Sequence, residues 1–154
     1  MQIIKQACGV YETNCYILFT PKGEFIIDPG TDALLFIKKH VKNPLAILNT
    51  HGHYDHIWDN AKVKKEYNIP IYIHKNDAFM LHDDFNQGYD SSDADFLVDN
   101  EDILNICGVD FKFHFLPGHT PGCTMIEIVG KNIMFSGDFL FYRSIGRWDF
   151  PYSD

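Results

Sequence analysis

The stretch Asn49-Thr50-His51-Gly52-His53-Tyr54-Asp55-His56 places three histidines and an aspartate within six residues. An apolar run at residues 45–48 precedes it and predicts a buried strand, and a helical pattern follows at residues 57–67. In an extended segment residues i and i+2 point the same way, so His51 and His53 can bind one ion, while the turn into the helix directs Asp55 and His56 towards a second position. The stretch therefore predicts two neighbouring metal positions on a loop at a strand end, where α/β folds place their sites.

Two later segments also end a predicted strand in ligand-type side chains. LPGHTPG (residues 116–122) presents His119 at the apex of a Pro/Gly turn, and FSGD (residues 135–138) ends in Asp138. Taken alone, each segment is more often a structural turn than a ligand site. Combined with the first stretch, they predict a metal centre built from three distant strand ends. The alternative is a solvated, histidine-rich turn in which Asp55 caps the following helix.

Apolar periodicity along the chain predicts a mixed α/β fold. Thr31 or Asp32 would cap the first of two expected helices. Residues 83–102 hold eight acids and no Lys or Arg, which predicts a solvated loop between elements, with a lid over a site as the alternative. Strands are expected at residues 2–7, 14–19, 24–28, 45–48, 70–74, 109–116, 124–129 and 132–135, and helices at residues 31–42 and 57–67.

Composition limits the class of protein. The chain has 154 residues, of which 45% are hydrophobic and 15% aromatic, so we expect one domain over residues 1–154 with a sizeable core. The net charge of −8 disfavours nucleic acids and anionic membranes as partners and leaves a small-molecule substrate. No membrane span or secretory signal is evident, so the expected location is cytoplasmic. The four cysteines form no CxxC pair and are expected to be reduced thiols.

Four sequence blocks resemble those of the metallo-β-lactamase superfamily, and more closely its glyoxalase II-like (hydroxyacylglutathione hydrolase-like) members. The blocks are NTHGHYDHIWDNA (residues 49–61), PGHTPGC (117–123), FSGDFLF (135–141) and SIGRWDFP (144–151). The resemblance implies an αβ/βα four-layer sandwich, with two sheets face to face, helices outside and a metal centre along one edge. It places His51, His53 and His119 on a first metal, Asp55 and His56 on a second, and Asp138 as the bridge between them.

The resemblance also implies a further ligand. Members of the superfamily usually continue beyond the GRxDFP block with a helix, a strand and a final His, whereas this chain stops at Asp154. We therefore expect a domain truncated at its C-terminus. Such a truncation would uncover a sheet edge through which the chain could form a homo-oligomer.

The implied function is that of a metal-dependent hydrolase, in which a metal-activated hydroxide attacks a thioester of the acylglutathione type. Asp55 and Asp138 are the expected catalytic residues, and Asp55 would position the nucleophile or accept its proton. Histidine and carboxylate ligands favour zinc, with two ions in the full-length form, and iron or manganese are alternatives. Lactones, phosphoesters and β-lactams stay open as substrates.

Two other functions also fit the sequence. Persulfide dioxygenases share the HxHxDH pattern and would hold one iron on His51, His119 and Asp138. A truncated form could instead bind metal without catalysis.

Several residues near these motifs have simpler expected roles. Cys123 is expected to be a buried thiol rather than a ligand. Tyr142, Arg143 and Arg147 could either meet an anionic substrate or support the fold. Asp28, in the turn Asp28-Pro29-Gly30, is expected to support the ligands from behind.

Overall fold

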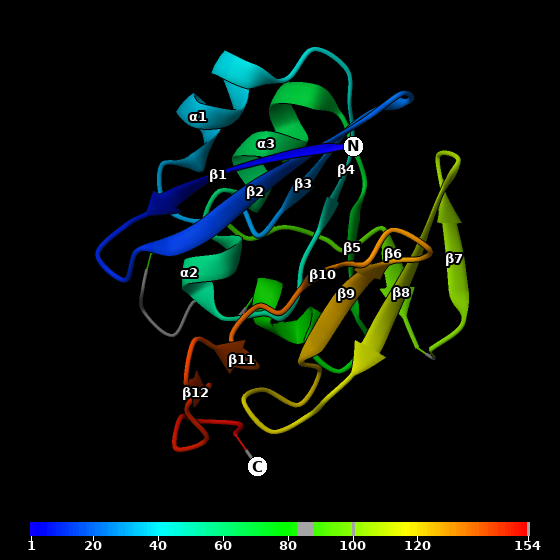
Figure 1. Cartoon of the computed structure of the whole chain (residues 1–154). Coiled ribbons are helices and arrows are strands. Elements are labelled where there is room, and N and C mark those ends of the chain that lie inside the picture. The colour runs from blue at the N-terminus through cyan, green and yellow to red at the C-terminus, as the bar shows by residue number, and fades with distance from the viewer. Residues whose placement is uncertain (83–87, 100, 154) are drawn as a thin grey trace.

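The computed structural model describes residues 1–82, 88–99 and 101–153 and shows two β-sheets that pack face to face (Figure 1). Part of the acid-rich segment, residues 83–87 and 100, lies outside the described residues. Helices lie on the outer side of the first sheet (Figure 1). This arrangement confirms the predicted α/β sandwich of two facing sheets.

The first sheet has six strands in sequence order. The first three strands form an antiparallel meander, and the last four run parallel to one another, because helices connect them on one face. The strands are β1 (Gln2–Cys8), β2 (Thr13–Thr20), β3 (Gly23–Ile27), β4 (Pro44–Leu48), β5 (Ile71–His74) and β6 (Phe96–Val98). The helices are α1 (Ala33–His40), α2 (Tyr54–Ile57), α3 (Asn60–Tyr67) and the single 3₁₀ turn η1 (Ala78–Leu81).

The second sheet is antiparallel and has the strand order β10-β9-β8-β7. Its strands are β7 (Ile103–Ile106), β8 (Val109–Phe115), β9 (Thr124–Ile128) and β10 (Ile133–Phe135). A short hairpin of β11 (Leu140–Phe141) and β12 (Ser144–Ile145) follows it. The sequence motifs near β10 did not predict this hairpin, because each of its strands has only two residues.

Two apolar layers hold these elements together. On β3, Phe25 and Ile27 face the second sheet, where the rings of Phe25 and Phe111 lie edge to face at 4.9 Å. Ile26, between them, faces the helices and packs with Ile37 of α1. This alternation is the two-residue period of a strand, and β4, which packs on both faces, is apolar throughout as predicted.

The structure corrects three details of the predicted elements. The expected loop over residues 83–102 contains β6, which pairs in parallel with β5, and β7 begins directly after it. The expected helix over residues 57–67 begins only at Asn60, as α3, and the separate short helix α2 covers the segment before it that was expected to be a loop. The two helices are not continuous, because the Asp59 amide donates to Pro29 O at 3.0 Å. Asp32 occupies the N-cap position of α1 as predicted, but its side chain makes no capping bond; Asp59 Oδ2 accepts from the Leu34 amide instead.

None of the helices in the described part of the chain has both the length and the apolar character that crossing a bilayer requires.

Candidate metal centre

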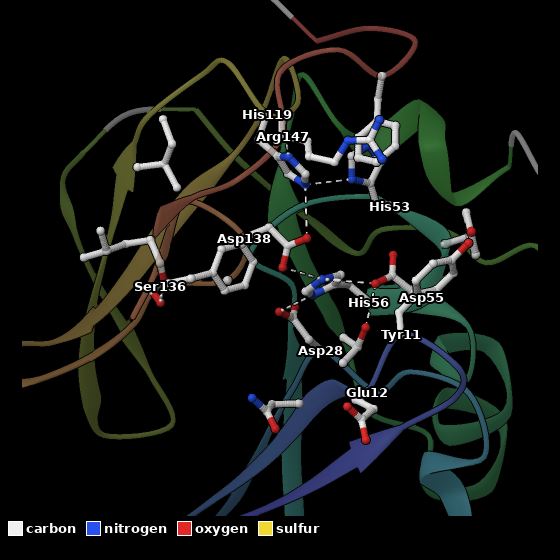
Figure 2. A pocket seen from close by; sticks show the side chains of 18 of the residues that line it. Tyr11, Glu12, Asp28, His53, Asp55, His56, His119, Ser136, Asp138 and Arg147 are labelled. Carbon is white, nitrogen blue, oxygen red and sulfur yellow. Dashed lines mark hydrogen bonds and ion pairs between the residues drawn. The ribbon is translucent and has the colours of Figure 1, made fainter. Parts of the chain in front are cut away.

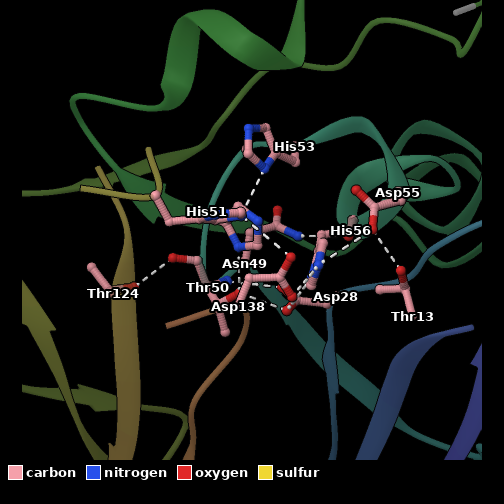
Figure 3. Close-up of polar contacts among 12 residues, drawn as sticks. Thr13, Asp28, Asn49, Thr50, His51, His53, Asp55, His56, Thr124 and Asp138 are labelled. Atoms are coloured by element: carbon pink, nitrogen blue, oxygen red, sulfur yellow. Dashed lines mark hydrogen bonds and ion pairs between the residues drawn. The ribbon is translucent and has the colours of Figure 1, made fainter. Parts of the chain in front are cut away.

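Six side chains predicted as ligands meet at one edge of the two sheets. Figure 2 labels all of them except His51, which Figure 3 labels. They come from the loop after β4 and the helix α2 that follows it, from the loop between β8 and β9, and from the segment after β10. Their ligand atoms form two sets, each within 4.8 Å: His51, His53, His119 and Asp138 in the first set, and Asp55, His56 and Asp138 in the second. The three segments therefore converge as the sequence predicts, and Asp138 is common to both sets.

In the first set, ring nitrogens point at one another rather than at ordinary hydrogen-bond donors. His53 Nδ1 lies 2.9 Å from His119 Nε2, and His119 Nε2 lies 3.3 Å from Asp138 Oδ2. His51 Nε2 is fully buried and has no hydrogen-bond partner. A buried nitrogen of this kind is rare unless it binds a ligand. The arrangement fits a cation that all four groups would share.

Hydrogen bonds behind the rings select the tautomers that such a cation needs. His119 Nδ1 lies 2.6 Å from Arg147 O, which can only accept, so Nδ1 carries the proton and Nε2 keeps its lone pair. The hydroxyl of Thr50 donates to Asp28 Oδ2 and can accept from His51 Nδ1 at 3.0 Å. Both rings therefore present a free lone pair to the centre of the set.

The second set surrounds one buried imidazole with carboxylates (Figure 3). His56 Nε2 lies 3.0 Å from Asp138 Oδ1 and 3.5 Å from Asp55 Oδ2, although neither contact has the alignment of a hydrogen bond. On the other side of the ring, His56 Nδ1 contacts Asp28 Oδ2 at 3.0 Å. Thr13 Oγ1 donates to Asp55 Oδ2 at 2.6 Å and holds that carboxylate in place.

Burial and neighbouring charges move the ligand pKa values in different directions. Burial lowers the pKa of His51 well below its usual value, and burial followed by the neighbouring His119 lowers that of His53 to about 4. For His56 burial also acts downwards, but the nearby carboxylates of Asp138 and Asp28 outweigh it and raise the pKa. For Asp138 burial acts upwards, and the contacts with His119 and His56 hold its pKa well below the usual range. The neutral rings of His51 and His53 and the ionised Asp138 are the forms that bind a metal.

These pKa values predict that the metal-free chain loses folding stability as the pH falls from 7 to 5. The unfolded chain protonates His53 near pH 6.5 but the folded chain does so only near pH 4, so falling pH favours the unfolded state. By pH 5 this residue alone contributes a loss of about 2 kcal/mol. His51 acts in the same direction and His56, whose folded pKa is raised, in the opposite one.

Urea unfolding in the presence of a chelator at pH 7, 6 and 5 measures this dependence. His53→Asn should reduce it, because Asn does not titrate, whereas replacement of the exposed Lys131 should leave it unchanged. A stability that is constant or rises towards pH 5 would contradict the prediction.

A cavity of about 890 Å³ opens over both sets. Aromatic side chains, among them Tyr11, Tyr16, Phe141 and Phe150, form much of its wall, and Lys5 adds a cation. The cavity is therefore large enough for an extended small molecule and has both apolar and charged wall groups.

The arginines predicted near the site take different positions. Arg147 lines the cavity, but its guanidinium forms two hydrogen bonds to Asp149, at 2.8 and 2.7 Å, and lies over the Phe150 ring. Its carbonyl oxygen, rather than its charge, touches the candidate ligand His119. Tyr142 also lines the cavity, and the Arg143 guanidinium lies over the Tyr142 ring.

Cys123 is fully buried and belongs to neither ligand set. Burial, and then the charges of Asp77 and Asp138, raise its pKa to about 12. We therefore expect a thiol reagent at pH 8 to modify only the exposed Cys107 in the folded chain, and all four cysteines after unfolding. Counting released chromophore before and after denaturant tests this, and Cys107→Ser should reduce the folded-state count to zero; rapid labelling of more than one thiol in the folded chain would contradict it.

Sequence patterns did not single out Thr13 and Asp77 as polar side chains that support the site. Thr13 belongs to none of the sequence motifs, and only the fold brings its side chain into contact with Asp55. Asp77 is the third residue after β5, just as Asp138 is the third residue after β10, and an acid after an apolar strand was the signal that identified Asp138. Asp28, which was expected to support the ligands, contacts both Thr50 and His56.

The sequence and the fold of this chain are similar to those of known proteins. The sequence model of the metallo-beta-lactamase superfamily matches residues 8–154. The hydroxyacylglutathione hydrolase GloC of Haemophilus influenzae is 34% identical over an alignment that covers 94% of this chain and 74% of that protein. The crystal structure of BLEG-1 B3 metallo-beta-lactamase matches this chain with a TM-score of 0.89 and 32% sequence identity. The match covers 99% of this chain and 79% of the BLEG-1 chain. TTHA1623, crystallised in a di-iron-bound form, matches with a TM-score of 0.79 and 29% sequence identity. This match covers 98% of this chain and 79% of the TTHA1623 chain.

Proposed function

Because this chain belongs to the metallo-beta-lactamase superfamily, whose members here include a hydroxyacylglutathione hydrolase, we propose that it is a two-metal thioester hydrolase. The observation that carries the proposal is the pair of ligand sets joined by Asp138. A carboxylate has two oxygens, and those of Asp138 face different histidines, Oδ1 towards His56 and Oδ2 towards His119. The residue can therefore serve two cations at once.

Zinc is the metal that we propose for both positions. Imidazole nitrogen and carboxylate oxygen in a four-ligand arrangement suit zinc, and the unpartnered Nε2 of His51 fits a cation that all four groups would share. Two divalent cations would supply an acidified water and a polarised carbonyl oxygen. The di-iron form of a similar protein makes iron the alternative that metal analysis must address.

The chain's own residues would position the reacting groups. Asp55 lies on the cavity wall, and the hydroxyl of Thr13 fixes one of its oxygens, so the carboxylate can hold an attacking water and accept its proton. His56 is held from behind by Asp28, which keeps its Nε2 directed at Asp55 and Asp138. The aromatic wall over these groups would exclude bulk water around the scissile bond.

The volume of the cavity and the cation on its wall support an acylglutathione as the substrate. Lys5 lines the wall, and no ion pair between it and another residue is found in the described part of the chain. It can therefore meet a substrate carboxylate. The identity of 34% to GloC supports the same substrate class, and the likeness to BLEG-1 makes β-lactams the competing class.

Metal analysis together with a substrate panel tests the proposal. We expect about two zinc ions per chain, and a kcat/KM for an acylglutathione at least about 100-fold above that for a β-lactam, a lactone or a phosphodiester. One equivalent of bound iron, together with oxygen uptake in the presence of glutathione persulfide, would show that the protein is a dioxygenase and not a hydrolase. Bound metal without turnover of any substrate would leave a metal-binding protein.

A further inference from the structure

We infer that Asp77 positions the first ligand set by holding its two loops together, although it is not itself a ligand. This inference rests on the metal centre proposed above. Asp77 is fully buried and follows β5, and it belongs to neither group of potential ligands.

Both oxygens of the Asp77 carboxylate accept hydrogen bonds from the ligand loops. Oδ2 accepts from the Gly52 amide at 2.9 Å and from the Thr120 hydroxyl at 2.6 Å, and Oδ1 accepts from the Gly122 amide at 2.5 Å. Gly52 lies between His51 and His53, and Thr120 follows His119 directly. One buried carboxylate thus joins a loop of the first sheet to a loop of the second, next to three of the four ligands.

Glycine at positions 52 and 122 makes this close approach feasible. A Cβ on residue 122 would lie 2.7 Å from the Asp77 amide nitrogen and 2.8 Å from its Cγ. A Cβ on residue 52 would lie 2.7 Å from Met80 Cβ and 3.0 Å from Asp77 O. These glycines are the G of the HGH motif and the second G of the PGHTPGC block. The close approach of Asp77 is a physical reason for a glycine at each of these two positions.

Asp77 is itself held firmly. Its amide donates to His74 O at 3.0 Å, and its carbonyl oxygen accepts from the Met80 amide at 2.9 Å, which starts η1. A second link, in which Thr124 donates to Thr50 O through its amide and its hydroxyl, ties the same two loops near His51 (Figure 3). His53 and His119, whose nitrogens lie 2.9 Å apart, are the sequence neighbours of Gly52 and Thr120, so the Asp77 carboxylate that binds both of these residues sets their spacing.

The substitution Asp77→Asn tests this role because it keeps the shape but replaces one acceptor oxygen by an amide group. Whichever way the amide turns, it faces the Gly52 or the Gly122 N–H, so one buried donor loses its partner. The matched control is Glu24→Gln. Glu24 is also a buried carboxylate that accepts from two backbone amides, those of Lys42 and Asn43, but it lies at the opposite end of β3 from the site.

The probe is Co²⁺, whose visible absorption reports ligand geometry and whose affinity follows from titration. We expect Asp77→Asn to weaken Co²⁺ binding by about 10- to 100-fold and to change the intensity of the absorption bands. Glu24→Gln, compared at a similar loss of metal-free stability, should bind within about twofold of the unaltered chain. Wild-type affinity and spectrum in folded Asp77→Asn would overturn the inference, as would an equal loss of affinity in the control.

If Asp77→Asn does not fold, Thr120→Val takes its place. Valine keeps the shape of threonine and removes only the hydroxyl that donates to Asp77, so we expect several-fold weaker Co²⁺ binding and the same spectral change. An unchanged affinity in this variant would overturn the inference. Failure of the unaltered chain to bind Co²⁺ would instead refute the metal centre itself, and with it any role of Asp77 towards a metal.

Discussion

Asp138→Asn is expected to leave at most one metal ion per chain and to lower thioester hydrolysis by more than about 1000-fold. The physical reason is that Asp138 is common to both ligand sets. An asparagine in its place has one oxygen and no charge, so it cannot face His56 and His119 with an acceptor on each side. Loss of a group that only supports a ligand costs about 10- to 100-fold, and loss of the shared ligand should exceed that.

The matched control for this substitution is Asp149→Asn. Asp149 belongs to the same C-terminal segment and pairs with Arg147 at the surface, but it is in neither ligand set. Elemental analysis and steady-state kinetics on both variants give the comparison. Two ions and near wild-type turnover in Asp138→Asn would contradict the proposed two-metal site, whereas a selective loss of one ion would show which histidines retain the other.

Asp28→Asn is expected to lower the free energy of unfolding of the metal-free chain by about 3 kcal/mol. Asp28 Oδ1 accepts from the Thr50 amide at 2.8 Å, and Oδ2 accepts from the Thr50 hydroxyl at 2.6 Å and contacts His56 Nδ1 at 3.0 Å. All three residues are buried. Without the carboxylate charge, the raised pKa of His56 loses one of its causes, and at least one buried donor lacks an acceptor.

Asparagine is the suitable replacement because Asp28 has a positive φ of 52°, which asparagine adopts more readily than alanine. Urea unfolding at pH 7 with a chelator measures the loss, and the exposed Asp110→Asn serves as control with nearly unchanged stability. A loss below about 1 kcal/mol would show that Thr50 and His56 find other partners.

The side chains that gather at the candidate metal centre were predictable from sequence because each of their segments carries a local signal. HGHYDH, PGHTPG and SGD each follow an apolar strand, and strand ends gather at one edge of a sheet. The single-residue supports were not predictable. Thr13, for example, lies 42 residues before Asp55, and nothing in its surroundings marks it as a partner of that carboxylate.

The same distinction applies to the fold. Strands that bury one or both faces, such as β2 and β4, have apolar patterns that local sequence reveals. The short strand β6 has two exposed residues out of three and depends on its pairing with β5, so its pattern is weak. The break between α2 and α3 depends on a hydrogen bond from Asp59 to Pro29, which is 30 residues away along the chain.

The amino-acid sequence alone thus determined which side chains are able to bind a cation and at which strand ends they lie, because residue type and the alternation of apolar and polar residues are local properties. Only the tertiary structure decided how those groups face one another: that the two oxygens of Asp138 face different histidines, that His56 is enclosed by carboxylates and that Asp77 joins the two loops. The reason is that these relations are distances between segments far apart in the chain, and packing of the two sheets sets them.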